Sequence, residues 1–344
     1  MRGDAADVVR DSLNATKTAE PLPGWVPLRA RATGNDRRVS PHPDPLAPAA
    51  RGRRDAAAVL VTGSSGRVGG AVAAAASAVG WAVRGCDRVP GRWATLLGDL
   101  RDPPARRAAL AGVQAVVHVA ALHAPHVGQV PSSQFRSINV DLTEALLAGA
   151  AATGVSRFVY TSSTSVYGHA LVPAGQAVWV DERLIPRPRD IYDETKLAAE
   201  TLVLTAGVPA AVLRIARCFP EPLQVLARHR LHRGVALADV AAAHLLALDQ
   251  VPVTGVFNIA GPLLFERGDT VSLYHRAPAV IRRRAPAAAA AFTQMGWPLP
   301  GRIDRVYDSC AARTALGYQP AEDVTGLLAP QLRCQAGTGP NRSA

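Results

Sequence analysis

The sequence is poor in lysine, contains no paired cysteines and has no long apolar run. Its four cysteines, Cys86, Cys218, Cys310 and Cys334, include no C-x-x-C pair, which argues against a disulfide framework and against a zinc site. No apolar run reaches the roughly 18 residues that a membrane span requires. These absences predict a cytoplasmic protein with reduced thiols, no bound metal and no membrane partner.

Arginine supplies almost all of the positive charge. The chain has 36 arginines but only two lysines, Lys17 and Lys196. A lysine that is kept in the folded region is therefore expected to do something arginine cannot, such as lowering a neighbour's pKa from a compact ammonium. The net charge of +11 is concentrated in short arginine runs with few aromatics between them. This pattern favours pockets for a diphosphate or a carboxylate over nucleic-acid binding.

The first 55 residues differ in composition from the rest. Residues 1–55 are rich in proline, arginine and small polar residues and show no sustained periodicity, which predicts a disordered, dispensable tail. Early acidic residues argue against a transit peptide, and the lack of an apolar core argues against a signal peptide. The remaining about 290 residues suffice for one large α/β domain with an added lobe.

The stretch from Val59 to Gly70, VLVTGSSGRVGG, predicts a strand, a tight turn and a helix over 67–79. Its glycines follow the spacing G-x-x-G-x-x-G. Glycine there allows a positive φ, leaves room for a pyrophosphate and lets the helix pack closely on the strand. The helix start then offers free N–H groups to the phosphates. The residues predicted to hold them are Gly63, Ser65, Gly66, Arg67, Val68 and Gly69.

An acidic residue follows at the distance expected for a dinucleotide site. A second strand over 81–86 ends at Asp87, whose carboxylate can accept hydrogen bonds from both ribose hydroxyls of NAD and would repel the 2′-phosphate of NADP. Arg84 and Arg88 flank it and can instead hold that phosphate. We expect NAD in preference to NADP. Asp99 and Leu100, at the next strand end, are predicted to meet the adenine.

The next segments continue the alternation of strands and helices. We expect a helix over 103–110, a buried strand over 113–121, a helix over 134–153 and a strand over 157–162. The strand over 113–121 ends in small residues, Ala120 and Ala121, as a strand crossed by a cofactor requires. His118, His123 and His126 follow no metal-ligand spacing, so they are expected to be satisfied or to line a pocket.

A run of hydroxyl residues and a tyrosine–lysine pair complete the pattern. The strand over 157–162 runs into Ser163 and Thr164, which places hydroxyls at the edge of the sheet where open α/β sheets bind ligands. A helix then carries Tyr192 and Lys196, which are four residues apart and so share one helical face. This spacing is weak evidence by itself. It gains weight from the glycine loop, from the serine strand end and from the rarity of lysine.

Together these motifs resemble the extended short-chain dehydrogenase/reductase family, in its NAD-dependent epimerase/dehydratase branch. The resemblance covers roughly residues 58–320, with the motifs in order. The segments that carry it are TGSSGRVG, GDL, HVAA, INVDLT, YTSSTSVYG, YDETK, DVAAAHLLAL and FNIAGP.

The family implies a fold, a division of the chain and an assembly. The implied fold is an α/β Rossmann-type doubly wound parallel sheet with a small C-terminal substrate lobe. The NAD(P)-binding domain would span 56–213. Residues 214–330 would form mainly the lobe, with some elements returning to the sheet, and 331–344 a flexible terminus. A homodimer formed through two helices is also implied.

The resemblance also assigns roles to individual residues. Tyr192 becomes the general acid/base of a carbinol whose hydride goes to nicotinamide, and Lys196 stabilises its phenolate. Ser163 hydrogen-bonds the reacting oxygen. Asn139 helps to place Lys196, for example through a water.

The departures from the family pattern narrow the substrate. The Asp-Glu pair of the family's dehydratases is replaced by Thr164 and Ser165, which argues against dehydration. An asparagine that contacts the diphosphate in nucleotide-sugar epimerases is replaced by Arg217, and the following segment is shorter than their nucleotide-holding lobe. The residues predicted to face a small-molecule substrate are His123, Ser163, Thr164, Arg217, Arg233 and Arg305; a surface salt bridge is an equal alternative for the last two.

Three functions follow from this pattern. Epimerisation of a sugar or nucleotide-sugar-like substrate through a transient ketone, with tightly held NAD, is the first expectation. A reductase or dehydrogenase that exchanges its cofactor is the second. A non-catalytic dinucleotide sensor is the third, and the complete set of Ser163, Tyr192 and Lys196 speaks against it.

Overall fold

The computed structural model describes residues 57–249 and 253–337. The predicted tail at 1–55 lies outside these residues, as does the last part of the predicted flexible terminus. Residues 331–337 of that terminus belong to a helix, α12 (Val324–Gly337). The described residues belong to one compact unit that begins at Ala57.

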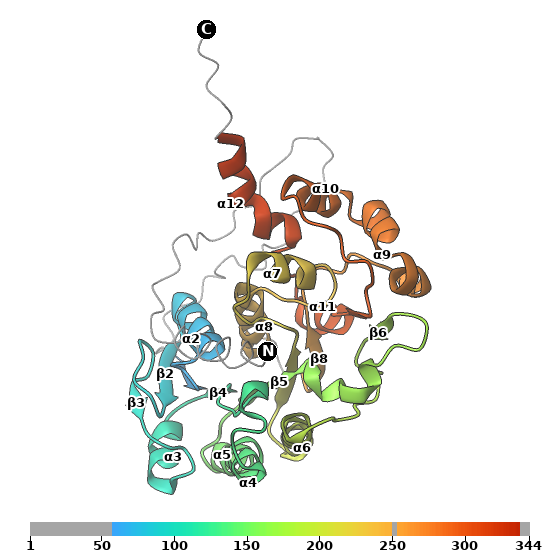
Figure 1. Ribbon diagram of the computed structural model, residues 1–344. Coiled ribbons are helices and arrows are strands. Elements are labelled where there is room, and N and C mark those ends of the chain that lie inside the picture. Colours follow the sequence, from blue (N-terminus) through green and yellow to red (C-terminus); the bar gives the residue numbers. More distant parts are fainter. Residues whose placement is uncertain (1–56, 250–252, 338–344) are drawn as a thin grey trace, which may run out of the picture. The chain divides into compact units, whose positions relative to one another are not determined.

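A seven-stranded sheet forms the centre of this unit (Figure 1). Its order is β3-β2-β1-β4-β5-β7-β8, and every neighbouring pair is parallel. The chain runs outward from β1 in one direction and then crosses over to β4 on the other side, which makes the carboxyl end of the β1–β4 boundary the expected ligand site. The strands are β1 (Ala58–Thr62), β2 (Ala82–Asp87), β3 (Leu96–Leu97), β4 (Ala115–His118), β5 (Arg157–Ser163), β7 (Ala210–Ile215) and β8 (Gly255–Ile259).

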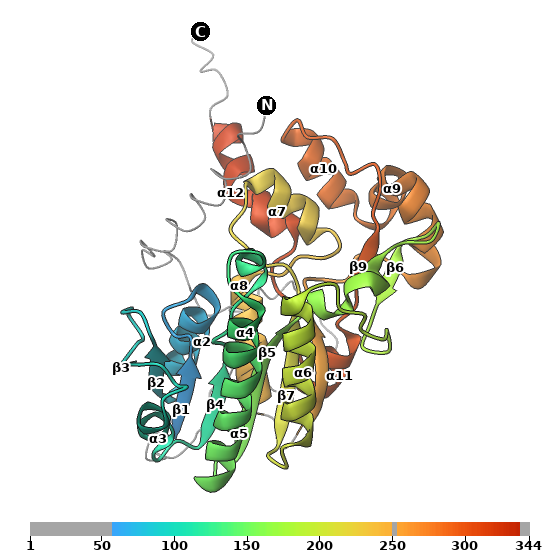
Figure 2. The same cartoon turned by 60° about the horizontal axis from the view of Figure 1, so that its bottom comes forward.

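Helices cover both faces of the sheet (Figure 2). Along β1, Val59 and Val61 face one layer while Leu60 faces the other, because successive strand side chains point to opposite faces. Burial on both faces explains why these strands are almost continuously apolar. One layer holds α2 (Arg67–Ala78), α8 (Leu237–Asp249) and α11 (Cys310–Leu316); the other holds α3 (Pro103–Leu110), α5 (Leu142–Ala152) and α6 (Ile191–Thr205).

A smaller lobe has its own apolar core beyond the carboxyl ends of the strands. Leu231, Leu273, Phe292 and Val306 are among its buried residues. A two-stranded parallel sheet pairs β6 (Val178–Val180) with β9 (Arg305–Tyr307). The lobe helices are α7 (Leu223–Arg230), α9 (Thr270–Arg284), α10 (Pro286–Gln294) and α12, with a short 3-10 turn, η4 (Arg267–Asp269), before α9.

Some elements belong to a different part of the fold from their neighbours in the sequence. The strand β6 lies within 56–213 but pairs with β9, while α8, β8 and α11 lie within 214–330 but join the main sheet. The chain therefore passes between the two parts several times.

The helix predicted over 134–153 is interrupted. It consists of α4 (Ser132–Arg136), a π turn η2 (Ser137–Asp141) and α5. Asn139 lies in the π turn, and its side chain bonds to Leu122 and Thr195 outside the helix. Single π turns often occur at functional sites. The strand predicted over 113–121 is shorter, because its last residues leave the sheet after His118.

Two short 3-10 segments complete the elements, η1 (Ala124–His126) and η3 (Thr164–Leu171). Across the described ranges, none of the helices is both long and apolar enough for a membrane span.

Candidate active site

The glycine loop lies between the end of β1 and the start of α2. Gly63 has a φ of +67° and its N–H donates to the Cys86 carbonyl at the end of β2 (2.9 Å). A side chain on Gly69 would put its Cβ 2.1 Å from the Gly63 carbonyl oxygen, and one on Gly66 would lie 3.2 Å from the same atom. The three predicted glycines thus let the loop and the helix start pack backbone against backbone.

A buried hydrogen-bond chain holds this loop to the end of β4. The backbone N–H of Ala120 donates to the Thr62 hydroxyl (3.1 Å), which lies 2.7 Å from His118 Nδ1. The other ring nitrogen lies 3.1 Å from the Thr143 hydroxyl, which donates to the Asn139 carbonyl (2.8 Å). Burial lowers the pKa of His118 to about 3, so this histidine is neutral and structural, as the sequence predicts.

Asp87 lies beside the glycine loop at the end of β2. Its carboxylate accepts the backbone N–H of Ser65 (3.0 Å) and that of Val89 (3.1 Å). Ser65 also donates its hydroxyl to the Val89 carbonyl (2.7 Å). These bonds hold the carboxylate against the turn, where a ribose would follow a pyrophosphate.

The charged residues near Asp87 in the sequence, Arg84, Arg88 and Asp99, differ in their contacts. Arg84 donates to the carbonyls of Ala109 and other residues at the end of α3 (3.1 Å to Ala109), so it is turned away from Asp87. Arg88 is exposed. Asp99 forms an ion pair with Arg101 (2.6 Å), which holds the pKa of that carboxyl below its usual value, and Leu100 is buried beside it.

Tyr192 and Ser163 meet at the carboxyl end of β5. Tyr192 lies in the first turn of α6 and is 8% exposed. Burial raises its pKa to about 12, while a hydrogen bond with the Ser163 side chain acts in the opposite direction. The Ser163 hydroxyl also accepts the backbone N–H of Ser165 (3.1 Å). Thr164 is buried next to them, and His123 is exposed with its ring 4.5 Å from that of His126.

Lys196 lies one helical turn after Tyr192. Its Nζ donates to the Thr161 carbonyl on β5 (2.8 Å) and lies 4.6 Å from the centre of the Tyr160 ring. Burial lowers the pKa of this ammonium to about 7, and the negative charge of Glu200 opposes that fall. The lysine is therefore poised to change charge near neutral pH.

Asn139 does not contact Lys196 directly. Its side-chain amide bonds to both backbone groups of Leu122 (2.8 and 3.0 Å) and donates to the Thr195 hydroxyl (3.1 Å). Thr195 precedes Lys196 on α6. Asn139 thus joins the π turn, the segment after β4 and the helix of the tyrosine–lysine pair.

The N-terminus of α6 is fixed by two aspartates. Asp190 accepts the backbone N–H groups of Tyr192 and Asp193 (3.0 Å each), which makes it the N-cap. The fully buried Asp193 accepts a hydrogen bond from the Ser165 hydroxyl and one from Arg189 Nε (3.2 Å). In the sequence, Asp190 carried a recognisable capping signal because it precedes a helical pattern. The partners of Asp193 carried none.

A buried ion pair behind Lys196 is absent from the sequence prediction. Arg214 on β7 donates three hydrogen bonds to Glu200 on α6 (the shortest 2.6 Å, between Nη2 and Oε2), and Ser162 donates its hydroxyl to the same carboxylate (2.5 Å). The side chains of Arg214 and Glu200 are 6% and 2% exposed. Two signals were available: a charged residue inside an apolar strand, and an acid four residues after Lys196.

Three predicted substrate residues gather near one another on the lobe side. Burial lowers the pKa of Arg233, and the nearby positive charges of Arg305 and Arg217 act in the same direction, while the negative charge of Asp304 opposes them. Arg217 pairs with Glu221 (2.5 Å), and Arg305 pairs with Asp304 (2.6 Å).

Among the described residues, no carboxylate accepts a hydrogen bond from the Arg233 side chain. Arg233 donates to Nε2 of His229 (2.9 Å), whose Nδ1 lies 3.0 Å from Glu221. Because arginine only donates, His229 must be neutral here and donate from Nδ1. The buried Nε of Arg233 has no hydrogen-bond partner.

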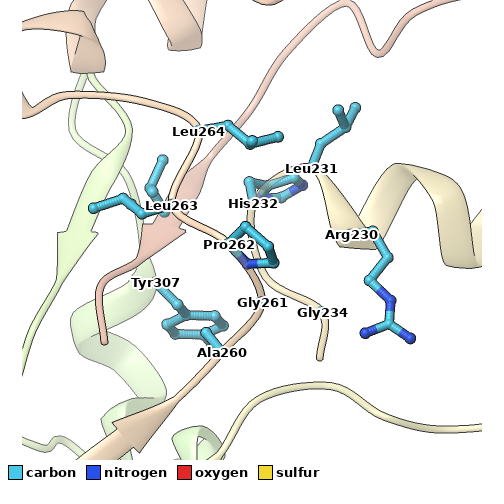
Figure 3. A pocket seen from close by; sticks show the side chains of 11 residues that line it. Arg230, Leu231, His232, Gly234, Ala260, Gly261, Pro262, Leu263, Leu264 and Tyr307 are labelled. Carbon is cyan, nitrogen blue, oxygen red and sulfur yellow. The ribbon is translucent and has the colours of Figure 1, made fainter. Parts of the chain in front are cut away.

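A small cavity lies in the lobe next to this group (Figure 3). Its walls come from the end of α7, the segment after β8 and the strand β9. Arg230 borders the cavity, and its pairing with Glu322 (3.0 Å) leaves the buried Nη1 without a partner. None of Arg217, Arg233 and Arg305 lines the cavity. The leucine and proline side chains in Figure 3 make it a gap in apolar packing.

The residues at the glycine loop fit a dinucleotide. The loop offers a cradle that a Cβ at Gly66 or Gly69 would fill, next to a helix N-terminus. Asp87 offers a fixed carboxylate for the ribose. Within the described residues, no group of three or more histidines, cysteines or acids is arranged to hold a metal ion.

Comparison with solved structures gives the same architecture. One similar structure is a short-chain dehydrogenase/reductase superfamily protein from Agrobacterium tumefaciens with bound NAD, with 23% identity, a TM-score of 0.61, and 81% of this chain and 97% of that chain covered. Another is the UDP-N-acetylglucosamine 4-epimerase from Bacillus cereus, with 23% identity, a TM-score of 0.60, and 81% and 99% covered. At this identity the likeness establishes the fold, a doubly wound parallel sheet of the Rossmann type, as the sequence predicts.

Sequence comparison finds one family model and several curated relatives that resemble part of the chain. The model of the NAD dependent epimerase/dehydratase family matches residues 59–221. A similar curated protein is a 3-beta-hydroxysteroid dehydrogenase from Mycolicibacterium neoaurum, 35% identical over 165 residues, which are 44% of this chain and 44% of that protein. The chain thus spans less than half the length of that relative. Residues 59–221 thus match the NAD dependent epimerase/dehydratase family, which confirms the resemblance seen in the sequence.

Proposed function

We propose that this protein is an NAD-dependent oxidoreductase that transfers a hydride at a carbinol or ketone carbon of a sugar or nucleotide-sugar-like substrate, with epimerisation as its net reaction. The observation that carries the proposal is the grouping of Ser163, Tyr192 and Lys196 at the carboxyl end of β5. This edge of the sheet also holds the glycine loop. The match to the family model supports NAD as the cofactor.

The glycine loop and Asp87 would hold NAD, and the bound nicotinamide would supply an acceptor for the hydride that can also return it to the other face of the ketone. Tyr192 removes the proton of the carbinol and later gives it back. With a pKa of about 12 before the cofactor binds, the phenol stays protonated at neutral pH and cannot accept the carbinol proton. A charged Lys196 stabilises the phenolate and lowers this value.

Ser163 positions the reacting oxygen. Its hydroxyl bonds to Tyr192 and is held by the Ser165 N–H, so a substrate oxygen bonded to Ser163 lies within reach of the phenol. The same hydroxyl stabilises negative charge that develops on that oxygen. Thr164 and Ser165 offer no carboxylate, so elimination of water is not part of the proposed reaction.

The charge balance of the lobe arginines favours a small negative group on the substrate. Two of the three arginines are paired with carboxylates, and Arg233 bonds only to a neutral histidine. This leaves about one positive charge for the substrate, which suits a carboxylate or one phosphate oxygen better than a whole diphosphate. We infer that the site selects a singly charged group, with Arg233 as its donor.

Isolation of the bound dinucleotide tests the proposal. Freshly purified protein is denatured, and the released small molecules are identified by mass spectrometry. Stoichiometric NAD supports epimerisation, because an epimerase keeps its cofactor through the cycle. A site that binds added NAD only weakly favours the second candidate, an exchanging dehydrogenase, which the resemblance to a hydroxysteroid dehydrogenase also favours. No dinucleotide binding at all would refute both.

A conservative substitution separates an enzyme from a dinucleotide sensor. Tyr192→Phe removes the phenolic hydroxyl. Turnover should fall by at least about 100-fold, the contribution of a general acid/base, while NAD affinity is retained. Tyr274→Phe on α9 makes the same chemical change in the lobe and serves as the control. Unchanged turnover by Tyr192→Phe, on any sugar that wild-type protein converts, would contradict the assigned role.

A further inference from the structure

Three residues of α6, the helix that carries Tyr192 and Lys196, contact the end of β5. Tyr192 bonds to Ser163, Lys196 donates to the Thr161 carbonyl, and Glu200 accepts the Ser162 hydroxyl. The three α6 residues are four apart, so they lie in one row on the helix face that contacts β5. Glu200 is the farthest of the three from the N-terminus of α6, and its partner Ser162 lies between Thr161 and Ser163 on β5.

Of these three α6 residues, Glu200 forms the most hydrogen bonds with the sheet. Its carboxylate receives three donated bonds from Arg214 and one from Ser162, over 2.5–3.2 Å. Ser162 and Arg214 are cross-strand partners in the β5–β7 register. One buried carboxylate therefore joins α6, β5 and β7, which fixes how far α6 can slide along the sheet.

Glu200 is also the negative charge that acts on Lys196. The groups that act on or face the ammonium are His118 and His123 from the β4 side, the Tyr160 ring from β5, and Glu200 from α6 itself. Arg214 faces Glu200 from β7. His118 is neutral, so it supplies no compensating charge. Burial alone drives the lysine toward its uncharged form, and Glu200 opposes this.

We propose that Glu200 is a positioning residue for Tyr192 and Lys196. Its hydrogen bonds with Ser162 and Arg214 fix α6 so that Lys196 can donate to the Thr161 carbonyl, and its negative charge keeps Lys196 protonated. The proposal rests on the proposed role of Lys196 but is tested without substrate. Its mechanism is electrostatic and geometric, and Glu200 itself touches neither substrate nor cofactor.

The rarity of lysine provides a direct measurement. Protein grown with isotope-labelled lysine gives two side-chain signals, from Lys17 and Lys196, and Lys196→Met identifies the second by its loss. The chemical shift is followed against pH in the full-length chain. In the wild-type protein Lys196 should titrate at a pKa of about 7, far below an ordinary lysine.

Glu200→Gln removes the charge and keeps the shape. The pKa of Lys196 should then fall by about one unit, a tenfold change in its protonation equilibrium. Glu182→Gln is the control that makes the same chemical change elsewhere: Glu182 is partly buried, and its carboxylate accepts the backbone N–H of Asn258 on β8. It should leave the Lys196 titration unchanged. An unchanged Lys196 titration in Glu200→Gln overturns the proposal.

A second variant covers the case in which Glu200→Gln does not fold. Glu200→Leu combined with Arg214→Met removes both charges and fills the space with apolar groups, which proteins often tolerate. Lys196 should again titrate below its wild-type pKa, and wild-type titration would overturn the proposal here too. Loss of NAD binding by wild-type protein would instead refute the proposed function, so the two failures are distinguishable.

Discussion

Gly69 offers the sharpest test of the dinucleotide loop. In Gly69→Ala the new Cβ would lie 2.1 Å from the Gly63 carbonyl oxygen and 3.2 Å from the Ser64 Cα. The obstacle is backbone on both sides, so no side chain can rotate away. The loop and the helix start must separate by roughly 1 Å, and such overpacking costs about 1–3 kcal/mol of folding stability.

The expected result is a loss of both stability and cofactor affinity. Each kcal/mol lowers the melting temperature by about 2–4 °C in a chain of this size. A displacement of about 1 Å at the phosphates should weaken NAD binding on the order of 100-fold. Thermal unfolding and titration calorimetry with NAD measure the two effects separately.

The neighbouring glycine supplies the control. A Cβ on Gly70 would meet the Ser64 carbonyl oxygen at 3.4 Å, an ordinary contact. Gly70→Ala should therefore bind NAD as the wild-type protein does, and it should gain up to about 1 kcal/mol from helix propensity. If Gly69→Ala binds NAD with wild-type affinity, then the argument that the loop's close packing shapes the phosphate cradle is incorrect.

Three further predictions follow from the site. Asp87→Ser should weaken NAD binding and shift preference toward NADP, because a fixed carboxylate that repels a 2′-phosphate is lost; parallel titrations with both dinucleotides measure this, and an unchanged preference contradicts it. Arg214→Met should destabilise the fold by about 3–5 kcal/mol by leaving Glu200 buried without its partner, whereas the double substitution with Glu200→Leu should recover most of the loss in urea unfolding. Burial sets the pKa of Lys196 at about 7, below the 10.5 of an unperturbed lysine. Between these two pH values the unfolded chain holds more protons than the folded chain, so the contribution of Lys196 to the free energy of unfolding should rise with pH. Lys196→Met should flatten this rise in unfolding experiments at several pH values.

Much of the fold followed from local patterns in the sequence. The apolar runs before Gly63 and Ser163 predicted buried parallel strands, because a strand covered on both faces must be apolar along its whole length. The glycine spacing predicted the turn, since only glycine permits such close backbone contact. Tyr192 and Lys196 were predicted on one face because helical geometry alone brings residues four apart together.

Other features depended on contacts between distant segments. The π turn at Asn139 arises from bonds to Leu122 and Thr195, and no helical propensity signals it. The partners of the lobe arginines likewise could not be assigned, because any nearby carboxylate can pair with an arginine. The predicted link between Asn139 and Lys196 is in the structure a direct bond to the preceding residue, Thr195.

The division has a simple physical basis. The spacing of residues along one strand or helix determines which side chains share a face. The sequence alone therefore determined the glycine loop, the order of the motifs along the chain, and the placement of Tyr192 and Lys196 on one face of α6. Only the tertiary structure decided the partners of buried charges, because a charge removed from water is stabilised by whichever opposite charge the packing brings near. For Glu200 that partner is Arg214, on a strand that pairs with β5.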